Sequence, residues 1–456
     1  MLKEVYVDGF RSLIDFRIQL KGGLNVIVGP NGTGKSNFIS FLDFVGELIS
    51  GGLNSAIATT HGAGSVFSQE KFSSDAAELT FVLSGETDTG RLGGRFYWGP
   101  NEETPQNGSY VYECRLRYDK SVPAIYISYE RLVVHVNDNR PLTFERFTER
   151  TEEKFSTVVR TNPSKHSLAT NLFRWARKNP KDGSDQHSVD EHLARTVGPD
   201  TSIVQRLMTE HPFLTAVILD ITAYRSINIE PSVARKPSPV GTDSDMQPTG
   251  EGLAAVLYRL ERGTYNPLGY VRPFAQHRTA DEQKRIFQMI MSWCREVNPH
   301  IRRAEVQLDF HEAQLRPVMI FSYPSGDSEF PFRRVSDGTV KWLALVTILF
   351  SEDSLSVIEE PENFLHPFMQ EAFIALCRQV IENNPSRSLI ISTHSPTLLD
   401  CCAPSELSMF EMIDGRTFAS SVENDAELNN TISRSRFGLG YFYKTGGVYG
   451  KDRSVS

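Results

Sequence analysis

The sequence predicts an α/β protein in which a mixed sheet with flanking helices is joined to an antiparallel β lobe and interrupted by a mainly helical insertion. Three observations predict this fold class. The β-branched run 24–28 passes through a glycine-rich turn into a helical pattern, which indicates a strand–loop–helix unit. Two further short apolar runs, 355–358 and 388–392, are typical of buried strands. Between residues 78 and 134, strand-like runs separated by turn residues indicate antiparallel pairing.

The first part of the chain, residues 1–139, is expected to contain the glycine-rich loop and the antiparallel lobe. After the loop, apolar residues recur at helical spacing and predict one buried helix face. The residues of this face are Phe38, Phe41, Leu42, Val45, Leu48 and Ile49. The lobe is predicted from four strand-like runs, at 79–83, 95–98, 110–118 and 124–134.

The remaining chain divides into two parts. Residues 140–300 are expected to be a mainly helical insertion, because helical patterns occur at 167–177, 188–197, 253–260 and 281–297. Within it, residues 231–251 are rich in Pro, Ser, Gly and Asp and predict a flexible or exposed connection. Residues 301–456 return to the α/β pattern and include a predicted hairpin at Asp414-Gly415. The aromatic run 437–443 predicts a segment packed against the domain or against an oligomer interface.

Composition excludes several classes of protein. The chain of 456 residues is long enough for two or three structural units with a buried core. Its 48 Lys and Arg against 56 Asp and Glu give a formal net charge of −8, which excludes a uniformly basic surface for duplex binding. No apolar run reaches the roughly 18–20 residues of a membrane span, and the N-terminus lacks the apolar region of a signal peptide. The five cysteines show no CxxC spacing, so we expect a cytoplasmic protein without disulfides.

The strongest motif is the segment 29–36 (GPNGTGKS), which matches GxxxxGK[ST] and lies between a predicted strand and a predicted helix. Its glycines let the backbone N–H groups surround phosphate oxygens. Its lysine would reach the β- and γ-phosphates, and its serine hydroxyl would ligate Mg²⁺. An ordinary glycine-rich turn is the weaker alternative in this context. We assign nucleotide binding to Asn31, Gly32, Gly34, Lys35 and Ser36.

Acidic residues and a histidine follow the two later strand runs. Glu359 and Glu360 end the first run, and His394 follows the second. Carboxylates at a strand end can hold the Mg²⁺ shell and orient an attacking water, and a neighbouring histidine can contact a γ-phosphate. Alone, such carboxylates are often only solvated, and a single histidine is more often structural. The phosphate loop in the same chain favours the functional interpretation.

A serine and a glycine, Ser336 and Gly338, open the helical stretch 340–350. A hydroxyl, a flexible backbone and a positive helix end together suit a γ-phosphate. This phosphate need not belong to the nucleotide bound by the chain's own loop. A simple N-cap formed by Ser336 or Asp337 would give the same sequence pattern.

Taken in order, the segments GPNGTGKSN, RVSDGT, SVIEEPENFLHP and STHSP resemble the ABC-type ATPase heads of the RecF, SMC and OLD proteins. The segment GEGLAAVLYRL also resembles RecF-like AAA ATPases of bacterial defence loci. The resemblance implies an ABC-type P-loop ATPase head that uses ATP and Mg²⁺, with two heads enclosing two ATP molecules. It also implies that Ser336 and Gly338 act on the γ-phosphate of the opposite protomer.

The same resemblance implies roles for the strand-end residues. Glu360 would orient or activate the hydrolytic water, Glu359 would support Mg²⁺, and His394 would sense the γ-phosphate. A metal-binding glutamine is also expected, and Gln69 is the nearest candidate. Glu359 departs from the family pattern, which usually has Asp there. The extra methylene moves the carboxylate outward by roughly one C–C bond length, so slow hydrolysis is an expected consequence.

The resemblance also bears on partners. The chain after His394 is too short for the TOPRIM nuclease of OLD proteins, the Asp-x-Asp at 243–245 lies in a polar setting typical of a solvated turn, and no HNH-like histidine pair occurs. The chain therefore resembles the ATPase subunit of a two-gene anti-phage system, the Septu ATPase first and the PARIS ATPase second. This implies head-to-head dimers or a higher homo-oligomer and a separately encoded HNH or TOPRIM nuclease.

DNA remains open as a further partner. Residues 141–180 contain eight Lys and Arg against four acidic residues, which would suit phosphates but is more typical of a solvated helical face. Three functions are therefore retained. The first is an ATPase that powers or times a defence complex, the second is a nucleotide-gated scaffold with little turnover, and the third is a RecF-like DNA-repair ATPase.

Overall fold

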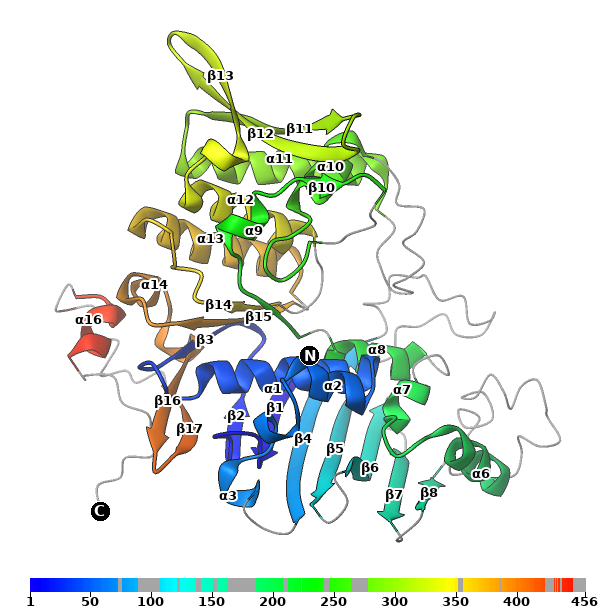
Figure 1. Cartoon of the computed structure of the whole chain (residues 1–456). Helices are drawn as coiled ribbons and strands as arrows, with labels where there is room; N and C mark the ends of the chain where they lie inside the picture. Colours follow the sequence, from blue (N-terminus) through cyan, green and yellow to red (C-terminus); the bar gives the residue numbers. More distant parts are fainter. Residues whose placement is uncertain are drawn as a thin grey trace.

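The computed structural model of the chain contains three sheets with helices between them (Figure 1). From the upper to the lower end of Figure 1, a four-stranded sheet, a layer of helices, a six-stranded sheet, helix α1 (Lys35–Ser50) and a seven-stranded sheet follow one another. The residues that the structure describes are 1–72, 76–88, 107–120, 124–136, 141–150, 154–162, 186–207, 212–222, 224–241, 246–263, 278–351, 356–385, 387–422, 430, 432, 434 and 437–445.

The six-stranded sheet lies at the centre and has the strand order β17-β16-β3-β15-β14-β9. All its neighbouring strands are parallel except β16 and β17, which form the hairpin predicted at Asp414-Gly415. Both faces are buried, because Val26 packs with the upper helices whereas Ile27 packs with the core around α1. The strands are β3 (Gly23–Val28), β9 (Arg225–Ile227), β14 (Ser356–Glu359), β15 (Ser388–Thr393), β16 (Leu407–Ile413) and β17 (Arg416–Ser421).

The seven-stranded sheet is the antiparallel lobe, with the order β2-β1-β4-β5-β6-β7-β8. Phe41 of α1 packs edge-on against Phe10 and Phe81, with ring centroids 5.5 Å apart in each pair. All six residues of the predicted helix face are buried in this core, which confirms that prediction. The strands are β1 (Leu2–Asp8), β2 (Phe16–Gln19), β4 (Ala76–Asp88), β5 (Asn107–Asp119), β6 (Ala124–Val136), β7 (Leu142–Arg150) and β8 (Phe155–Thr161).

The segment 140–300 is not a helical unit of its own. Its strands β7 and β8 extend the antiparallel sheet, and β9 forms the edge of the central sheet. Three helices of this segment lie beside the lobe in Figure 1: α6 (Gln186–Thr196), α7 (Ile203–Leu207) and α8 (Pro212–Thr222). Helical periodicity was present in the sequence, but strand pairing with distant segments decides where each piece lies. The predicted strand at 95–98 and the predicted helix at 167–177 lie outside the described residues.

The upper layers are formed by the rest of this segment and by residues after 300. Residues 231–251 are predicted to be a flexible or exposed connection. In its described part Ser232 and Val240 are exposed, whereas Ala234, Ser238 and Met246 are buried, so the connection packs against the core only at separate positions. The helices of this part are α9 (Pro231–Ala234), α10 (Leu253–Arg262), α11 (Ala280–Val297), α12 (Asp337–Ser351) and α13 (Pro367–Asn383). The strands of the four-stranded sheet are β10 (Ser238–Pro239), β11 (Ile301–Asp309), β12 (Gln314–Tyr323) and β13 (Gly326–Pro331).

Short elements complete the fold. The predicted aromatic segment forms α16 (Leu439–Lys444), which packs beside α14 (Pro396–Asp400): the Gly440 N–H donates to Oδ1 of Asp400 at 2.7 Å. Leu439 is buried there. The segment therefore packs against the domain, which is one of the two positions predicted for it. The remaining helices are α2 (Leu53–Thr59) and α3 (Gln69–Phe72), with short 3₁₀ turns at Ala63–Ser65, Phe332–Arg334 and Pro404–Glu406.

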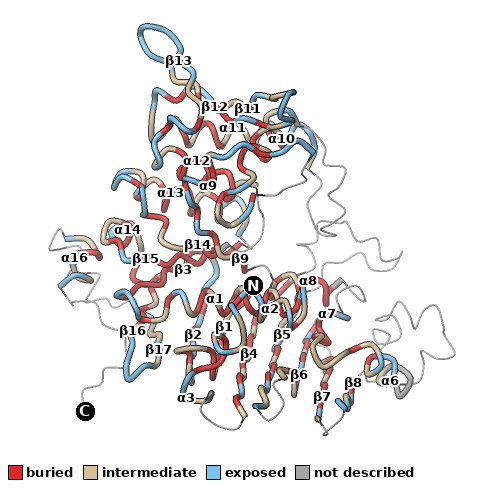
Figure 2. The backbone as a smooth tube through the Cα atoms, viewed as in Figure 1, coloured by how far each residue is buried: buried red, intermediate tan, exposed pale blue. Residues whose placement is uncertain are grey.

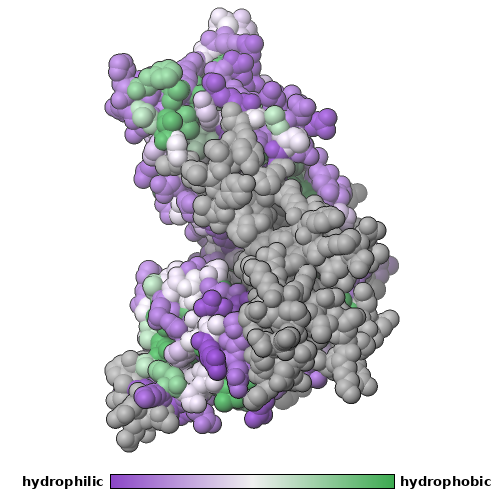
Figure 3. All heavy atoms as spheres, turned by 90° about the vertical axis from the view of Figure 1, so that its right-hand side faces the viewer, coloured by the Kyte–Doolittle hydropathy of each residue, from purple (hydrophilic) through white to green (hydrophobic). Residues whose placement is uncertain are grey.

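Burial follows the layers. Buried residues concentrate where sheets and helices face one another (Figure 2). The face drawn in Figure 3 is largely hydrophilic over its described part, with small hydrophobic areas, and is hollowed between its upper and lower portions. Within the described part of the chain, no helix combines the length and the apolar character that crossing a membrane requires.

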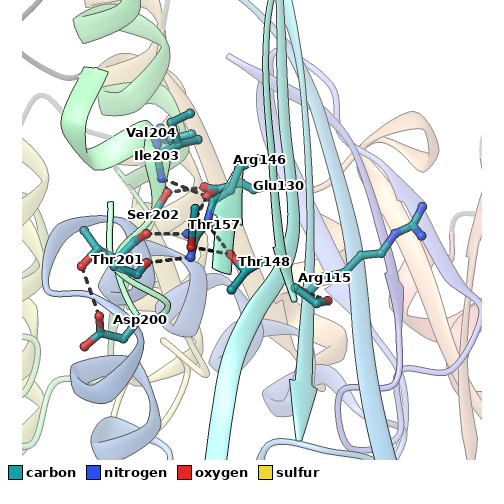
Figure 4. Close-up of polar contacts among 12 residues, drawn as sticks. Arg115, Glu130, Arg146, Thr148, Thr157, Asp200, Thr201, Ser202, Ile203 and Val204 are labelled. Carbon is teal, nitrogen blue, oxygen red and sulfur yellow. Dashed lines mark hydrogen bonds and ion pairs between the residues drawn. The ribbon is translucent and has the colours of Figure 1, made fainter. Parts of the chain in front are cut away.

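A buried ion pair holds the lobe to the segment before α7 (Figure 4). Arg146 of β7 and Glu130 of β6 both have fully buried side chains, 3.5 Å apart. The Arg146 guanidinium donates to the carbonyl oxygens of Gly198 and Thr201, each at 2.6 Å. The Ser202 hydroxyl and the Ile203 N–H donate to the Glu130 carboxylate. Arg146 belongs to the basic stretch 141–180, but its burial excludes it from any surface that binds phosphates.

Replacing Ser202 with Ala is expected to lower the free energy of unfolding by about 1.5 kcal/mol, because the buried Glu130 carboxylate loses one of its donors. Glu130 keeps its bonds from Tyr112 and Ile203, so the fold should survive. Thermal unfolding of the variant beside Ser128→Ala, whose hydroxyl bonds a carbonyl at an exposed position, measures the difference. Equal Tm values for the two variants would contradict this role of the network.

Candidate functional site

The loop 29–36 connects β3 to α1 and has the backbone of a phosphate-binding loop. Gly32 and Gly34 have positive φ values of 84° and 95°, which residues with a Cβ rarely adopt. A Cβ on Gly34 would lie 1.9 Å from Oγ1 of Thr417 in β17, so the β16–β17 hairpin packs directly on the loop. The exposed loop residues include Asn31, Gly32 and Ser36. The first turn of a 16-residue helix follows this exposed loop.

Lys35 lies at the base of this loop. Its ammonium donates to the carbonyl oxygens of Gly29 at 2.6 Å and Pro30 at 3.0 Å, and the residue is 6% exposed. Burial lowers the pKa of Lys35, and the carboxylates of Glu360 and Glu362 oppose that shift. The lysine of the loop therefore interacts electrostatically with the acidic residues that follow β14, some 320 residues later in the sequence.

The two strand ends predicted to meet do meet. β14 and β15 are parallel neighbours, and Glu359 pairs in register with Ser392. Nδ1 of His394 lies 3.6 Å from Oε1 of Glu360. The Glu360 carboxylate also accepts a hydrogen bond from the Asn363 side chain at 3.0 Å. A carboxylate and an imidazole thus face each other at the C-terminal edge of the sheet, beside the loop that carries Lys35.

A third carboxylate, Glu362, completes this edge, and sequence reasoning gave it no role. It is 7% exposed and accepts hydrogen bonds from the Thr393 hydroxyl at 2.7 Å and the His394 N–H at 3.0 Å. Nδ1 of His394 lies 3.4 Å from the same oxygen. Glu362 therefore fixes the backbone and ring of the histidine. Its spacing of two residues after Glu360 was visible in the sequence, but its burial was not.

Glu359, the residue that departs from the family pattern, contacts the neighbouring strand β9. Its Oε1 accepts a hydrogen bond from the Ser226 hydroxyl at 2.7 Å. The Ser226 N–H in turn donates to Oδ1 of Asp43 in α1 at 2.9 Å. Burial raises the pKa of Asp43 to about 6, against the lowering effect of the Ser226 hydrogen bond, and the Glu359 charge adds to the rise. The longer side chain of Glu359 is thus held by Ser226.

Replacing Ser226 with Ala should weaken Mg²⁺-dependent nucleotide binding by roughly tenfold in the Mg²⁺ concentration required, because residues that orient a metal ligand have effects of this size. Titration of Mg²⁺ against a fluorescent ATP analogue measures this requirement. Ser292→Ala, on the exposed side of α11, is the matched control. An unchanged Mg²⁺ requirement in Ser226→Ala would exclude an orienting role for this hydroxyl.

Ser336 and Gly338 lie at the start of α12. The Ser336 hydroxyl interacts with the Thr339 hydroxyl at 2.8 Å and accepts from the Thr339 N–H at 3.3 Å, which is the capping pattern. Ser336 is nevertheless exposed. A Cβ on Gly338 would lie 2.7 Å from the Phe364 carbonyl oxygen, so only glycine fits. Between them, Asp337 forms an ion pair with Arg235. The guanidinium of Arg235 thus neutralises the one carboxylate between Ser336 and Gly338 at this helix end.

Mg²⁺ ligands can be assessed from the donors present. Ser36 and Glu359 supply oxygen donors, which suit a metal that uses few protein ligands beside phosphate and water. Gln69 lies on α3, where it is exposed. Its neighbour Glu70 pairs with Arg416 of β17 at 2.9 Å, so this chain of contacts reaches the loop through the β16–β17 hairpin. A metal-binding role for Gln69 stays a prediction.

A polar cluster beside the first turn of α1 escaped the sequence analysis. The Ser12 hydroxyl interacts with the Thr417 hydroxyl and with the Asn37 amide, both at 2.7 Å. Arg11 has a positive φ of 47° and donates to the Ser65 carbonyl oxygen at 2.8 Å. The turn after β1 is therefore bound to the first turn of α1 and to β17, which both adjoin the phosphate-binding loop, although its residues form no recognisable motif in the sequence.

The basic residues of the stretch 141–180 divide into several settings. Arg150 lies 3.8 Å from Asp119 and also over the Phe155 ring, and Arg160 lies over the Phe147 ring at 5.5 Å. Lys154 is exposed. The residues Lys165, Phe173, Arg174, Trp175, Arg177 and Lys178, and the Asp243-Ser244-Asp245 pattern, lie outside the described residues. The described part of the stretch is thus engaged largely in contacts within the lobe.

Comparison with known proteins gives one family match. The family described as "AAA domain, putative AbiEii toxin, Type IV TA system" matches residues 24–400. The match begins in β3, before the phosphate-binding loop, and ends in α14, after His394. It therefore includes both strand ends and the start of α12. No curated protein matches the chain.

Solved structures with similarity include heads of SMC proteins. A SmcHead bound to the C-winged helix domain of ScpA is 13% identical over 93% of this chain and 99% of its own, with a TM-score of 0.44. An SMC head domain from Thermotoga maritima is 13% identical over 92% and 99%, with a TM-score of 0.37. An Smc head domain with an extended coiled coil from Pyrococcus furiosus, bound to the C-terminal domain of ScpA, is 14% identical over 96% and 99%, with a TM-score of 0.41.

Proposed function

The chain belongs to the AAA domain family described as putative AbiEii toxin of a Type IV TA system, and on this premise we propose that it binds and hydrolyses ATP as a subunit of a bacterial anti-phage defence complex. In this proposal it senses infection and controls a separately encoded nuclease. The observation that carries the ATPase part is the meeting of Lys35, Glu360 and His394 at one edge of the central sheet.

ATP binding follows from the loop 29–36. Its backbone N–H groups and the start of α1 suit the β- and γ-phosphates, and Lys35 supplies the positive charge. Ser36 and Glu359 would hold Mg²⁺, which neutralises charge on the phosphates when bound. Ser226 keeps the Glu359 carboxylate directed along the edge of the sheet.

Hydrolysis follows from Glu360 and His394. Glu360 would orient the water and accept its proton as the oxygen bonds to the γ-phosphorus. The bond to the β–γ bridging oxygen breaks, and its electron pair leaves with ADP. His394, held by Glu362, would donate a hydrogen bond to the γ-phosphate. The 3.6 Å separation of Glu360 and His394 lets both groups act around one phosphate.

The exposed start of α12 supports a head-to-head assembly. Ser336 and Gly338 present a hydroxyl and a tight helix end to the outside of the chain. In a dimer they would contact the γ-phosphate bound by the partner, so each site would need two chains. The exposed Arg333 and Arg334 precede this helix end and would face the nucleotide or the neighbouring chain.

The defence role rests on the family and on the resemblance to the Septu and PARIS ATPases. The family description names a toxin of a Type IV TA system. By analogy with those two-gene systems, a separate HNH or TOPRIM protein would cut nucleic acid. The ATPase would hold that nuclease until infection is sensed. This chain would then determine when the nuclease is released, and the partner would cleave the nucleic acid.

The proposal is tested by mass photometry of the purified protein with and without ATP, beside a phosphate-release assay on the same sample. Oligomers with measurable ATP turnover are expected. Failure to bind ATP would overturn the proposal.

A nucleotide-gated scaffold is the second candidate, and Glu359 favours it. The glutamate replaces the usual aspartate and bonds Ser226 of the neighbouring strand, which changes the setting of the Mg²⁺ ligand. Oligomers that retain ATP without releasing phosphate would support the scaffold and would make the partner nuclease the only enzyme of the complex.

A further inference from the structure

Lys341, on the second turn of α12, is a buried charge that the proposed mechanism does not use. The residue is 1% exposed. Its ammonium donates a hydrogen bond to the backbone carbonyl oxygen of Glu360 at 3.3 Å. It also lies 5.8 Å from the centre of the Phe364 ring. A buried lysine costs folding free energy that an apolar residue of the same length would not, so its contacts need an explanation other than packing.

The backbone that Lys341 contacts is strained. Glu360 has a φ of 41°, in the left-handed region that favours glycine. Its N–H donates to the Ser392 carbonyl oxygen at 3.0 Å, and its carbonyl oxygen accepts from the Asn363 N–H at 3.2 Å. The Lys341 ammonium is the further donor to that carbonyl oxygen. The direction of the Glu360 side chain depends on this conformation being held.

Helix α12 touches the same turn at a second point. The Phe364 carbonyl oxygen approaches Gly338 so closely that a Cβ would lie 2.7 Å away. Phe364 itself has a φ of 68° and is 62% exposed. Helix α12 therefore contacts the turn from Glu360 to Phe364 at two points, Gly338 and Lys341, which are one helical turn apart.

We propose that Lys341 is a positioning residue that fixes the backbone of Glu360 and ties it to the exposed start of α12. A shift of Ser336 and Gly338 would then move the carbonyl oxygen that Lys341 holds, and with it the Glu360 carboxylate. Since the start of α12 would serve the partner's nucleotide, this contact links one ATP site to the other. The inference rests on the proposed ATPase function.

The charge of Lys341 is balanced by the groups that face it. Burial lowers its pKa to about 8, while the carboxylates of Glu362 and Glu360 oppose the shift. The ammonium form therefore predominates below about pH 8, and the neutral amine forms above it. His394 and Lys35 lie around the same two carboxylates. Because the folded-state pKa lies below the ordinary value of 10.5, the charge destabilises the fold at neutral pH.

Lys341→Met separates positioning from packing. We expect kcat to fall at least tenfold, because the Glu360 backbone loses a donor. ATP binding should stay within about twofold, and Tm should stay equal or rise, because a buried charge has been replaced by an apolar chain of similar length. A merely structural lysine would give an unchanged kcat, which would overturn the inference.

Two further measurements make the test specific. The kcat of the wild type should decline as the pH rises through about 8, and this decline should be absent from Lys341→Met, which retains Lys35. Thr347→Val, which removes a buried hydroxyl two turns along the same helix, should leave kcat and its pH profile unchanged. An alkaline decline with the same midpoint of about pH 8 in Lys341→Met would also overturn the inference.

The outcome for Lys341 can be distinguished from the outcome for the proposed function. If the wild type binds no ATP, the proposed function fails and Lys341 has no reaction to position. If the wild type hydrolyses ATP and Lys341→Met does so equally fast, only the inference fails. If the wild type binds ATP without turnover, an unchanged oligomeric response to ATP in Lys341→Met also contradicts the link between the sites.

Discussion

Replacing Glu360 with Gln should slow ATP hydrolysis by about 100–1,000-fold, because the amide cannot accept the proton of the attacking water. The substitution keeps the shape of the side chain and a carbonyl oxygen for the Asn363 contact. ATP binding should therefore persist, and ATP-dependent oligomers should become longer-lived. Phosphate release under saturating ATP measures the first effect, and mass photometry measures the second.

The control for Glu360→Gln is a glutamate of the same region without a place in the site. Glu371 on α13 borders a shallow pocket with Trp293 and Phe368, so Glu371→Gln changes the net charge equally. Its turnover should match the wild type. If Glu360→Gln turned over at the wild-type rate, the water would have to be activated by another group, and Glu362 would be the next carboxylate to test.

The sequence could predict those parts of the site that depend on local order. The spacing of its glycines, lysine and serine identifies the loop 29–36 as a phosphate-binding loop. Apolar patterns predict the strand before it and the helix after it. Glu359 ends β14, and Glu360 and His394 directly follow β14 and β15, so the parallel pairing of these strands brings the three residues together. The hairpin at Asp414-Gly415 likewise follows from its two residues with positive φ.

The groups that hold those residues could not be predicted in the same way. Ser226 reaches Glu359 only because β9 pairs with the edge of β14. Lys341 reaches Glu360 only because α12 packs against the turn after β14. Nothing in the sequence near Ser226 or Lys341 indicates those neighbours, since each contact joins distant segments.

The sequence placed the end of the lobe at residue 139 too early, for a similar reason. The sequence changes character there, but the hydrogen-bonded ladder of the lobe continues through β7 and β8. The prediction for the connection 231–251 holds only in part. Its composition is typical of a linker, and Ser232 and Val240 are exposed, but Ala234 and Met246 are buried in the upper core, because single apolar residues gain from burial even within a polar segment.

Replacing Ser336 with Arg should abolish ATP turnover while leaving ATP binding to the loop of Lys35 largely intact. The side chain of Ser336 is exposed, and its hydrogen bonds among the described residues are with Thr339. A large cation at this helix end would keep a second head from closing over the nucleotide. Fluorescent ATP binding and phosphate release measure the two properties separately. Ser325→Arg, in the exposed turn before β13, is the control.

Mixing two inactive variants gives the decisive form of this test. Lys35→Ala lacks the loop lysine, and Ser336→Arg lacks the helix end. If each site combines Lys35 of one chain with Ser336 of the other, a mixed dimer has one intact site, and an equal mixture should recover measurable turnover, up to about a quarter of the wild-type value when the two sites act independently. If Ser336 serves the nucleotide of its own chain, every site in the mixture is defective, and no turnover returns. Because neither variant can hydrolyse ATP alone, recovery has no other source than a site shared between chains.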